Sequence, residues 1–227
     1  MANTDSNGES NNMNPYYQDD YVTIYHGDCR EILPGLPMAD IVLTDPPYGI
    51  GETAGKNKSR SKVARARDYG NYDWDNKTVS QRLMHDVIDA GEYACIFGGN
   101  YYTMPPSSAW LVWDKQNTGD FADCELAWTN YGCAVRIKRH LWNGMLRKGR
   151  ERRYHPTQKP LDVIIWCISL CPGEPQTILD PFAGSCTTGR AAKDLGRKCV
   201  CIEMEEKYCE IGAKRMAQEV FDFGGDL

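Results

Sequence analysis

The residues best suited to chemistry lie in the sequence Asp45-Pro46-Pro47-Tyr48-Gly49. The apolar run 41–43 before it is typical of a buried strand, and two consecutive prolines cannot continue a strand. Each proline fixes its own φ and biases the residue before it toward extended conformations, so Asp45 and Tyr48 are expected on a stiff turn. Such a turn suits a catalytic clamp, although the same residues taken alone also fit an ordinary turn that ends a strand.

A second acidic residue follows another expected strand. Residues 21–25 alternate in a β-rich pattern and lead through His26 and Gly27 to Asp28, before a short helix at 30–33. The carboxyl ends of strands line the ligand crevice of open α/β sheets, so Asp28 and Asp45 are both site candidates. The alternative role for Asp28 is to cap the helix that follows it.

The last third of the chain has the pattern of a βαβ unit. A strand at 177–179 runs into Asp180-Pro181-Phe182-Ala183-Gly184-Ser185, a helix continues to about Leu195, and a strand at 199–202 ends at Glu203. A small-residue turn with an acid roughly 20 residues later is the arrangement that binds a nucleoside, with the acid on its ribose hydroxyls. The turn is not G-x-G-x-x-G and no Lys follows it, which disfavours a dinucleotide or a P-loop phosphate site.

The remaining elements fit one α/β domain. We expect helices at 78–90, 161–170 and 206–220 and strands at 92–97, 110–114, 121–128 and 133–137. Residues 1–20 are rich in Asn, Asp, Ser and Gly and predict a disordered tail, which leaves a single domain over 21–227. Within it, residues 51–76 form a loop too long for a simple connection, and the irregular parts of 115–154 predict an arm outside the main sheet.

Composition limits the class of protein. With 41% hydrophobic and 25% charged residues, the 227-residue chain has ordinary globular usage. No apolar run reaches the roughly 18 residues that a membrane span needs, and the polar N-terminal segment lacks the apolar centre of a signal peptide. We therefore expect an intracellular protein without a membrane partner. The ten cysteines fall mostly in apolar segments, which favours reduced core thiols, and no zinc-finger spacing predicts a metal site.

The net charge of −5 conceals two basic runs, one inside 51–76 and one inside 136–153. Together they hold 14 of the 26 basic residues, with aromatic residues such as Tyr69, Trp74 and Trp142 among them. A basic run is commonly a solvated face, but two concentrated runs with interleaved aromatic side chains favour a polyanion. The candidate contacts are Lys56, Lys58, Arg60, Lys62, Arg65, Arg67, Arg139, His140, Arg147, Lys148, Arg150, Arg152 and Arg153.

Three motifs in one order make the chain similar to a known family. Asp45-Pro46-Pro47-Tyr48 is followed by His155-Pro156-Thr157-Gln158-Lys159-Pro160 and then by Asp180-Pro181-Phe182-Ala183-Gly184-Ser185. This order resembles the β group of amino-methylating DNA methyltransferases, which use S-adenosylmethionine. The resemblance covers about residues 21–215. It implies an α/β fold, a circularly permuted Rossmann-like domain with a mostly parallel, seven-stranded sheet and helices on both faces.

The resemblance also implies roles for residues. Asp45, Pro46, Pro47 and Tyr48 would be catalytic. The cofactor would contact Asp28 near its adenine, Glu203 at its ribose and Lys159 at its carboxylate, with Asp45, Asp180, Phe182, Ala183, Gly184 and Ser185 around it. The sequence departs from the family at Cys186, where the family usually has a second glycine. A side chain at this position is expected to crowd the methionine end of the cofactor.

The chemistry explains why an acid and an aromatic ring would be needed. The lone pair of an exocyclic amine is delocalised into its heteroaromatic base, so the amine is a poor nucleophile. If Asp45 and the Pro46 carbonyl accept hydrogen bonds from its two N–H groups, the lone pair is directed at the sulfonium methyl and developing positive charge is stabilised. The base must leave the duplex to reach such a pocket, and Tyr48 would stack on it.

The resemblance favours adenine, because Asp usually accompanies adenine at the first motif position and Ser usually accompanies cytosine. It implies N6 methylation of a flipped adenine in double-stranded DNA by a bacterial or phage-encoded cytoplasmic enzyme. Target recognition would fall to 115–154, with 51–76 closing over the base. Open alternatives are an N4-cytosine enzyme, an RNA or protein methyltransferase and an inactive DNA-binding relative. The recognition sequence, a restriction partner and homodimer formation are not decided by the sequence.

Overall fold

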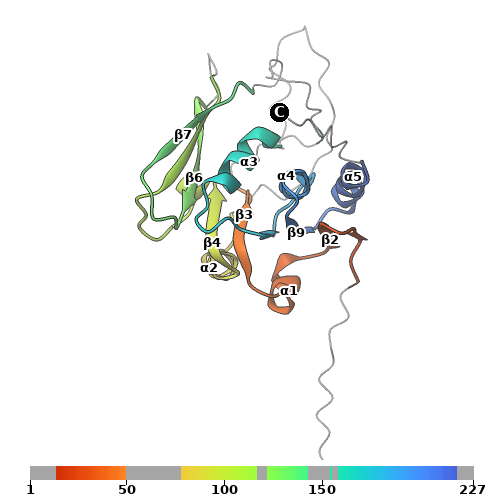
Figure 1. Cartoon of the computed structure of the whole chain (residues 1–227). Helices are drawn as coiled ribbons and strands as arrows, with labels where there is room; N and C mark the ends of the chain where they lie inside the picture. The colour runs from red at the N-terminus through yellow and green to blue at the C-terminus, as the bar shows by residue number, and fades with distance from the viewer. Residues whose placement is uncertain (1–13, 50–77, 117–121, 143–153, 155–157, 219–227) are drawn as a thin grey trace, which may run out of the picture.

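The computed structural model describes residues 14–49, 78–116, 122–142, 154 and 158–218. The strands of this part form one mixed sheet in the order β1-β2-β9-β8-β3-β4-β6-β5-β7 (Figure 1). Their bounds are β1 Tyr17–Gln18, β2 Val22–His26, β3 Ala39–Thr44, β4 Gly91–Phe97, β5 Trp110–Asp114, β6 Cys124–Thr129, β7 Arg136–Arg139, β8 Thr177–Asp180 and β9 Lys198–Glu203.

Helices cover both faces of the sheet, as expected for the predicted fold. Figure 1 places α3, α4 and α5 over one face and α1 and α2 over the other. The helices are α1 Cys29–Ile32, α2 Gln81–Asp89, α3 Leu161–Ser169, α4 Thr187–Asp194 and α5 Glu206–Met216, with short 3-10 turns η1 Leu33–Gly35 and η3 Gly99–Tyr101. No helix in the described ranges is long and apolar enough to cross a membrane.

The core has two layers because successive side chains of a buried strand point to opposite faces. In β3, Ile41 and Leu43 belong to the apolar cluster that contains residues of α3 and α4. Val42, between them, packs in the cluster that contains Leu83 and Val87 of α2. The continuous apolar run of β3 is thus explained by burial on both sides.

The mostly parallel α/β fold predicted from the sequence is confirmed, but the predicted number of strands is wrong. Strands β2, β9, β8, β3 and β4 are parallel neighbours. The described sheet has nine strands rather than seven. Short strands at both edges bring the number to nine: β1 pairs antiparallel with β2, and β7 pairs parallel with β5.

The N-terminal edge corrects the predicted tail. Within the expected tail 1–20, residues 17–18 form β1, while residues 1–13 lie outside the described ranges. The turn after β1 depends on Asp19, whose Oδ1 accepts the backbone N–H groups of Tyr21 at 2.9 Å and Val22 at 2.7 Å. Lys193 of α4 pairs with the same carboxylate at 2.5 Å. Local side-chain capping and a tertiary ion pair therefore order a segment that has little aliphatic content.

The segment 115–154 contains two strands that overlap those predicted at 121–128 and 133–137. Both β6 and β7 lie inside this segment, and both are strands of the main sheet. β6 is antiparallel to both of its neighbours, β4 and β5, and so joins β5 to the central parallel strands. The segment therefore contributes two strands to the main sheet, and a role in target recognition stays a prediction.

Candidate active site

The site lies where parallel strands end beside one another. In the sheet, Asp180 at the end of β8 is opposite Cys201 of β9, and His26 at the end of β2 is opposite Glu203. Asp45 follows β3, the other neighbour of β8. A cavity of about 50 Å³ at this edge is lined by residues that include Asp45, Lys159, Asp180 and 182–185. The three motifs singled out in the sequence therefore meet in one place.

Asp180 fixes the turn that follows β8 by accepting hydrogen bonds. Its Oδ1 accepts hydrogen bonds from the Thr44 hydroxyl at 2.6 Å and from the Phe182 backbone N–H at 3.2 Å. Burial raises the pKa of Asp180 to about 6, against the lowering effect of these hydrogen bonds. Asp180 thus ties the end of β3 to the small-residue turn, which is a positioning role.

Glu203 holds the same turn from the side. Its Oε2 accepts the Gly184 backbone N–H at 2.7 Å, and its Oε1 accepts the Glu205 N–H at 2.8 Å. Burial raises the pKa of Glu203 to about 7, although both hydrogen bonds favour the ionised form. The carboxylate therefore stands at the end of β9 directly against the turn.

Arg215 is a residue of this region that sequence reasoning missed. It lies in α5, is 6% exposed, and its Nη1 donates to the Ser185 carbonyl at 2.5 Å and to the Thr187 hydroxyl at 3.2 Å. A cation buried in this way fixes the start of α4 relative to α5. The sequence pattern of the closing helix gave no signal for it beyond a basic residue near the helix end.

The Asp45 turn is clamped by aromatic residues that follow β4. The Tyr48 hydroxyl donates to Asp45 Oδ1, and the Tyr102 hydroxyl donates to the Pro47 carbonyl. The Tyr48 ring stacks on Tyr101 with centroids 4.8 Å apart. Gly98 lies beside this ring with φ +65°, and a Cβ there would clash with the Tyr48 ring. The stiff turn that the prolines predicted is thus also fixed by tertiary contacts.

A chain of charged side chains, of which Lys159 is buried and the others are half-buried, reaches Asp45 from the antiparallel part of the sheet. Lys159 Nζ lies 2.5 Å from Asp45 Oδ2 and 3.1 Å from Glu125 Oε2. Lys115 Nζ lies 2.5 Å from the other oxygen of Glu125. Glu125 was missed in the sequence, where its one signal is its position in β6 on the same strand face as buried Ala127.

The four charges perturb one another in different directions. Burial raises the pKa of Asp45 above its ordinary value, despite the ammonium of Lys159. Burial would also raise the pKa of Glu125, but Lys159 and Lys115 together bring it below the ordinary value. Burial lowers and the two carboxylates raise the pKa of Lys159, and the carboxylates prevail. Glu125 is therefore the more firmly ionised partner of Lys159.

Asp28 lies at the expected strand end but has another local role. The Arg30 backbone N–H donates to its Oδ1 at 2.9 Å, so Asp28 caps α1, and the Arg30 guanidinium pairs with its carboxylate. The hydrogen bond from that guanidinium lowers the pKa of Asp28. The alternative of a helix cap is therefore present, and the contact of Asp28 with a cofactor stays a prediction.

His140 is a correction to the predicted nucleic-acid contacts. Its side chain is 4% exposed and its Nδ1 lies 3.5 Å from Asp162 Oδ2 at the start of α3. The Trp113 indole N–H donates to the His140 backbone carbonyl at 3.0 Å. Trp142 beside it is also buried. The apolar surroundings from α3 and β5, which the sequence does not reveal, draw this aromatic pair into the core.

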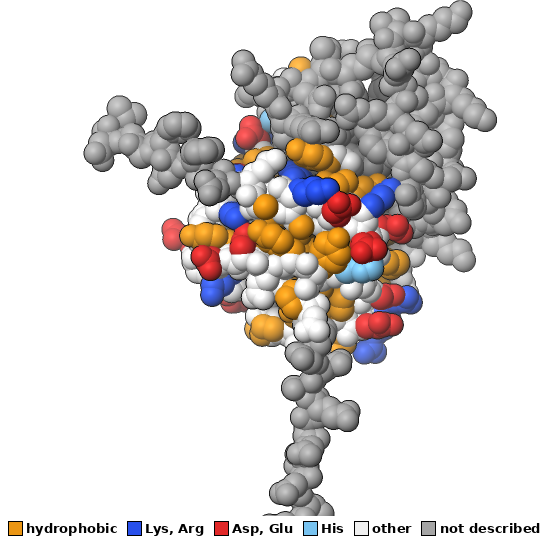
Figure 2. Space-filling model, turned by 90° about the vertical axis from the view of Figure 1, so that its right-hand side faces the viewer, with side chains coloured by type: hydrophobic (Ala, Val, Ile, Leu, Met, Phe, Trp, Pro, Cys, Tyr) orange, Lys and Arg blue, Asp and Glu red, His pale blue; other side chains and the backbone are white. Residues whose placement is uncertain are grey.

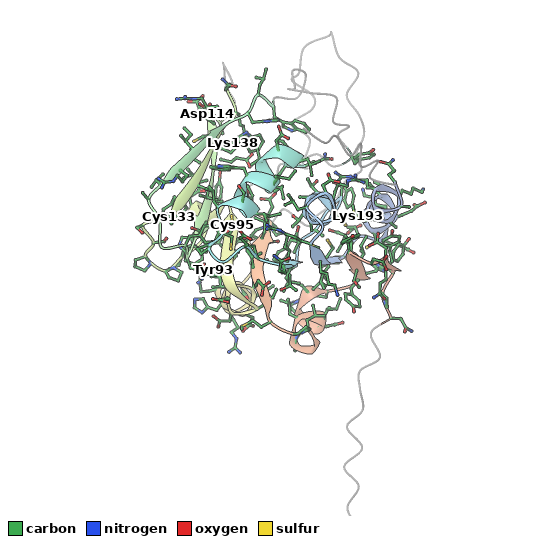
Figure 3. The ribbon with its side chains drawn as sticks, in the orientation of Figure 1. Tyr93, Cys95, Asp114, Cys133, Lys138 and Lys193 are labelled. Carbon is green, nitrogen blue, oxygen red and sulfur yellow. The ribbon has the colours of Figure 1, made fainter. Side chains whose placement is uncertain are left out.

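Arg139 is the candidate contact that the structure leaves at the surface. Its side chain is 70% exposed and lies 3.4 Å from Asp114. Figure 3 shows Asp114 and Lys138 together at one end of the β5–β7 pair. The other candidates lie outside the described residues: Lys56, Lys58, Arg60, Lys62, Arg65, Arg67, Arg147, Lys148, Arg150, Arg152 and Arg153.

The packing around Cys186 shows how a cysteine is accommodated where the family usually has glycine. It has φ +56°, a left-handed conformation that favours glycine, and it is fully buried. A Cβ added to Gly212 of α5 would come 2.5 Å from Cys186 Sγ. The thiol therefore packs against α5, and Cys186 is not among the residues that line the cavity. The effect of Cys186 on the methionine end of the cofactor stays a prediction.

We expect Gly212→Ala to destabilise the protein by about 1–3 kcal/mol, because the added methyl overpacks the space that Cys186 Sγ fills. In the double variant with Cys186→Gly, the loss should be mostly recovered, since the sulfur is removed and the left-handed residue becomes glycine. Urea unfolding of the two single variants and the double variant measures the coupling. Additive losses would contradict the packing described here.

The cysteines and potential metal ligands offer no further centre. All ten cysteines are free, and most of them are buried. Among the residues that the structure describes, no group of three or more His, Cys, Asp or Glu side chains is arranged to hold a metal ion. The site is therefore described by its carboxylates, its lysine and its turns.

The chain is similar in sequence to known DNA methylases. Residues 115–214 match the family model N6_N4_Mtase, described as DNA methylase. The chain is 28% identical over 270 residues to the type II methyltransferase M.ScaI of Streptomyces caespitosus, covering 90% of this chain and 84% of that protein. It is 43% identical over 67 residues to the DNA adenine methyltransferase YhdJ of Escherichia coli, covering 29% of this chain and 22% of that protein.

Two solved structures share the fold. The M1.HpyAVI–SAM complex matches with a TM-score of 0.55 and 23% identity, covering 86% of this chain and 99% of that one. The cytosine-N4-specific PvuII DNA methyltransferase matches with a TM-score of 0.60 and 16% identity, covering 93% and 92%. At these identities the likeness concerns the architecture, which is that of S-adenosylmethionine-dependent DNA methyltransferases.

Proposed function

We propose that this chain is a DNA methylase of the N6 and N4 type, which transfers a methyl group from S-adenosylmethionine to the N6 amino group of adenine in DNA. The observation that carries the proposal is the meeting of Asp45, on its clamped turn, with the Asp180 turn at one edge of the sheet. Nucleophile-directing and cofactor-holding elements are then adjacent, as a direct transfer requires.

Asp45 and Pro46 act on the target amine. The Asp45 carboxylate and the Pro46 carbonyl accept hydrogen bonds from the two N–H groups of the amine. These bonds direct the amine lone pair at the sulfonium methyl and stabilise the positive charge that develops on nitrogen. Tyr48 keeps the carboxylate in place through its hydroxyl and offers its ring to the flipped base. Bound S-adenosylmethionine supplies an electrophilic methyl group on a positively charged sulfur.

The residues beside Asp45 fit that cofactor. The turn 182–185 brings backbone close to the cavity, and Gly184 has φ +51°, so a backbone surface without a side chain faces the approach. Glu203 stands beside this turn as the ribose acceptor, and Lys159 is the cation near the cofactor carboxylate. Phe182, Ala183 and Ser185 complete the contact surface, with Asp28 near the adenine ring.

The DNA is proposed to lie along the edge that carries β7. Arg136 and Arg139 are exposed on this strand and Lys138 is half-buried, without an acid between them. Figure 2 shows the opposite edge, where acidic and basic side chains alternate among apolar ones and form no basic surface in the described part. Double-stranded DNA with a flipped base, recognition by 115–154, a homodimer and a location in the bacterial cytoplasm are parts of this proposal. The loop expected at 51–76 lies outside the described residues.

Cofactor affinity should depend on pH through Glu203. Its pKa is about 7, so the carboxylate is protonated below that pH and ionised above it. Acceptance of two ribose hydroxyl groups needs the ionised form, so affinity should rise several-fold between pH 6 and pH 8. Titration of S-adenosylmethionine by calorimetry measures this rise, and Glu203→Gln should bind weakly with little dependence on pH. An equal slope in both proteins would contradict the role of Glu203.

The function is tested by transfer of labelled methyl from S-adenosylmethionine to equal amounts of unmethylated DNA, RNA and total protein in separate reactions. Hydrolysis of the labelled DNA to nucleosides should give N6-methyladenine. Label found in N4-methylcytosine would move the target to the alternative base. Label found in RNA or protein alone would overturn the DNA proposal, and cofactor binding without transfer would favour an inactive relative.

A further inference from the structure

The Asp45 carboxylate already has two partners in this structure. Lys159 Nζ lies 2.5 Å from its Oδ2, and the Tyr48 hydroxyl donates to its Oδ1. In the proposed reaction, one of these oxygens must accept an N–H bond of the target amine. The ammonium of Lys159 therefore competes with the target amine for this carboxylate, and a shift of the ammonium would leave the oxygen free for the amine.

Glu125 is placed to receive the shifted ammonium. Its Oε2 lies 3.1 Å from Lys159 Nζ, longer than the contact with Asp45, so a small movement of Nζ exchanges the near partner for the far one. The other Glu125 oxygen is fixed by Lys115 at 2.5 Å. Lys159 Nζ also lies over the Phe97 ring at 5.2 Å from its centroid, so the ammonium stays in favourable surroundings on that path.

We propose that Glu125 is a positioning residue that draws the Lys159 ammonium off Asp45 when the target amine arrives. This inference rests on the proposed function. Lys159 keeps its charge and a partner throughout, and Asp45 is freed to accept the amine N–H. No covalent bond changes in this step, because one ammonium moves between two carboxylates while the incoming amine takes its place.

Two observations support the direction of the exchange. Glu125 has its pKa lowered while Asp45 has its pKa raised, so Glu125 offers the more persistent negative charge. The cavity beside Lys159 is about 50 Å³, below the roughly 300 Å³ of a small ligand pocket, so movement of a side chain that lines it would enlarge the site. Lys159 lines this cavity and has an alternative partner within reach.

The test compares three variants in single-turnover methyl transfer. Glu125→Gln should slow transfer by about 10- to 100-fold, the scale of losing a partner that orients a reactive group. Cofactor affinity should stay within about threefold, because the turn 182–185 and Glu203 are untouched. Lys115→Met should slow transfer less than Glu125→Gln does, since Glu125 still faces Lys159 although it loses the cation at its other oxygen.

The double variant Lys115→Met with Glu125→Gln separates positioning from charge balance. It removes one charge of each sign, so a purely electrostatic or folding role predicts recovery of the rate. The exchange of Lys159 predicts that the double variant stays as slow as Glu125→Gln. Because Glu125 raises the pKa of Asp45, the acidic limb of the pH–rate profile should also move to lower pH in Glu125→Gln.

A normal rate in Glu125→Gln, recovery in the double variant or an unmoved acidic limb would each overturn the inference while the wild-type enzyme remains active. Absence of methyl transfer by the wild type itself would instead overturn the proposed function. Thermal melting and cofactor titration of every variant show that the compared proteins are folded.

Discussion

Asp45→Ala is expected to lower the rate of methyl transfer at least about a thousandfold, while cofactor affinity stays within about threefold. The variant removes the carboxylate that accepts the amine N–H and stabilises charge on nitrogen, but it leaves the turn 182–185 and Glu203 in place. Folding should be retained because Lys159 still has Glu125 as a partner at 3.1 Å. Single-turnover transfer and calorimetric cofactor binding measure the two effects.

Asp45→Asn is the matched control, because it keeps the shape and one acceptor oxygen but loses the charge. An intermediate rate would show that hydrogen-bond direction and charge both contribute. A rate for Asp45→Ala within tenfold of the wild type would remove Asp45 from the chemistry, and parallel loss of cofactor binding would make it a cofactor residue instead.

Lys159→Met is expected to destabilise the protein by about 3–5 kcal/mol at pH 8, the scale for breaking a buried ion pair by removing one partner. The side chain is 6% exposed, and its loss leaves two carboxylates, Asp45 and Glu125, without the cation between them. Their pKa values then rise in the folded state, so the folded protein binds protons more readily than the unfolded chain. The deficit should therefore shrink as the pH falls from 8 to 5.

Urea unfolding at several pH values checks this prediction, with the triple variant Asp45→Asn, Glu125→Gln and Lys159→Met as control. The triple variant keeps no carboxylate in this cluster, and only the Lys115 ammonium remains charged, so its stability should recover in part and lose its pH dependence over this range. A deficit in Lys159→Met that stays constant with pH would indicate lost packing of the lysine stem rather than unpaired carboxylates.

Regular elements with their own local signal were predicted well from the sequence. The buried strand β3 and its proline-rich end, the strand β5 and the helix α3 all lie where the apolar pattern placed them. A strand buried on two faces has a continuous apolar run, and prolines end it. The strand and its end can therefore both be predicted from neighbouring residues. The three motifs singled out in the sequence also line one cavity at the edge of the sheet.

Features that depend on partners distant in the sequence were not predicted. Glu125 has no local signal for an ion pair with Lys159, and His140 has none for its burial against α3. The strand β1 forms because Asp19 caps its turn and pairs with Lys193. The thiol of Cys186 is accommodated only because α5 places Gly212 against it. Each of these depends on tertiary packing, which a sequence pattern does not contain.

The central claim is that this chain methylates adenine in DNA through Asp45. The most direct measurement expresses the wild type and Asp45→Ala in a bacterial host that lacks adenine methylation and quantifies methylated nucleosides in its genomic DNA by mass spectrometry. A genome offers every short recognition sequence, so the unknown target is not an obstacle. The account predicts N6-methyladenine in the wild-type culture and none above background with Asp45→Ala. Equal amounts in both cultures, or none in either with both proteins folded and binding cofactor, would contradict it.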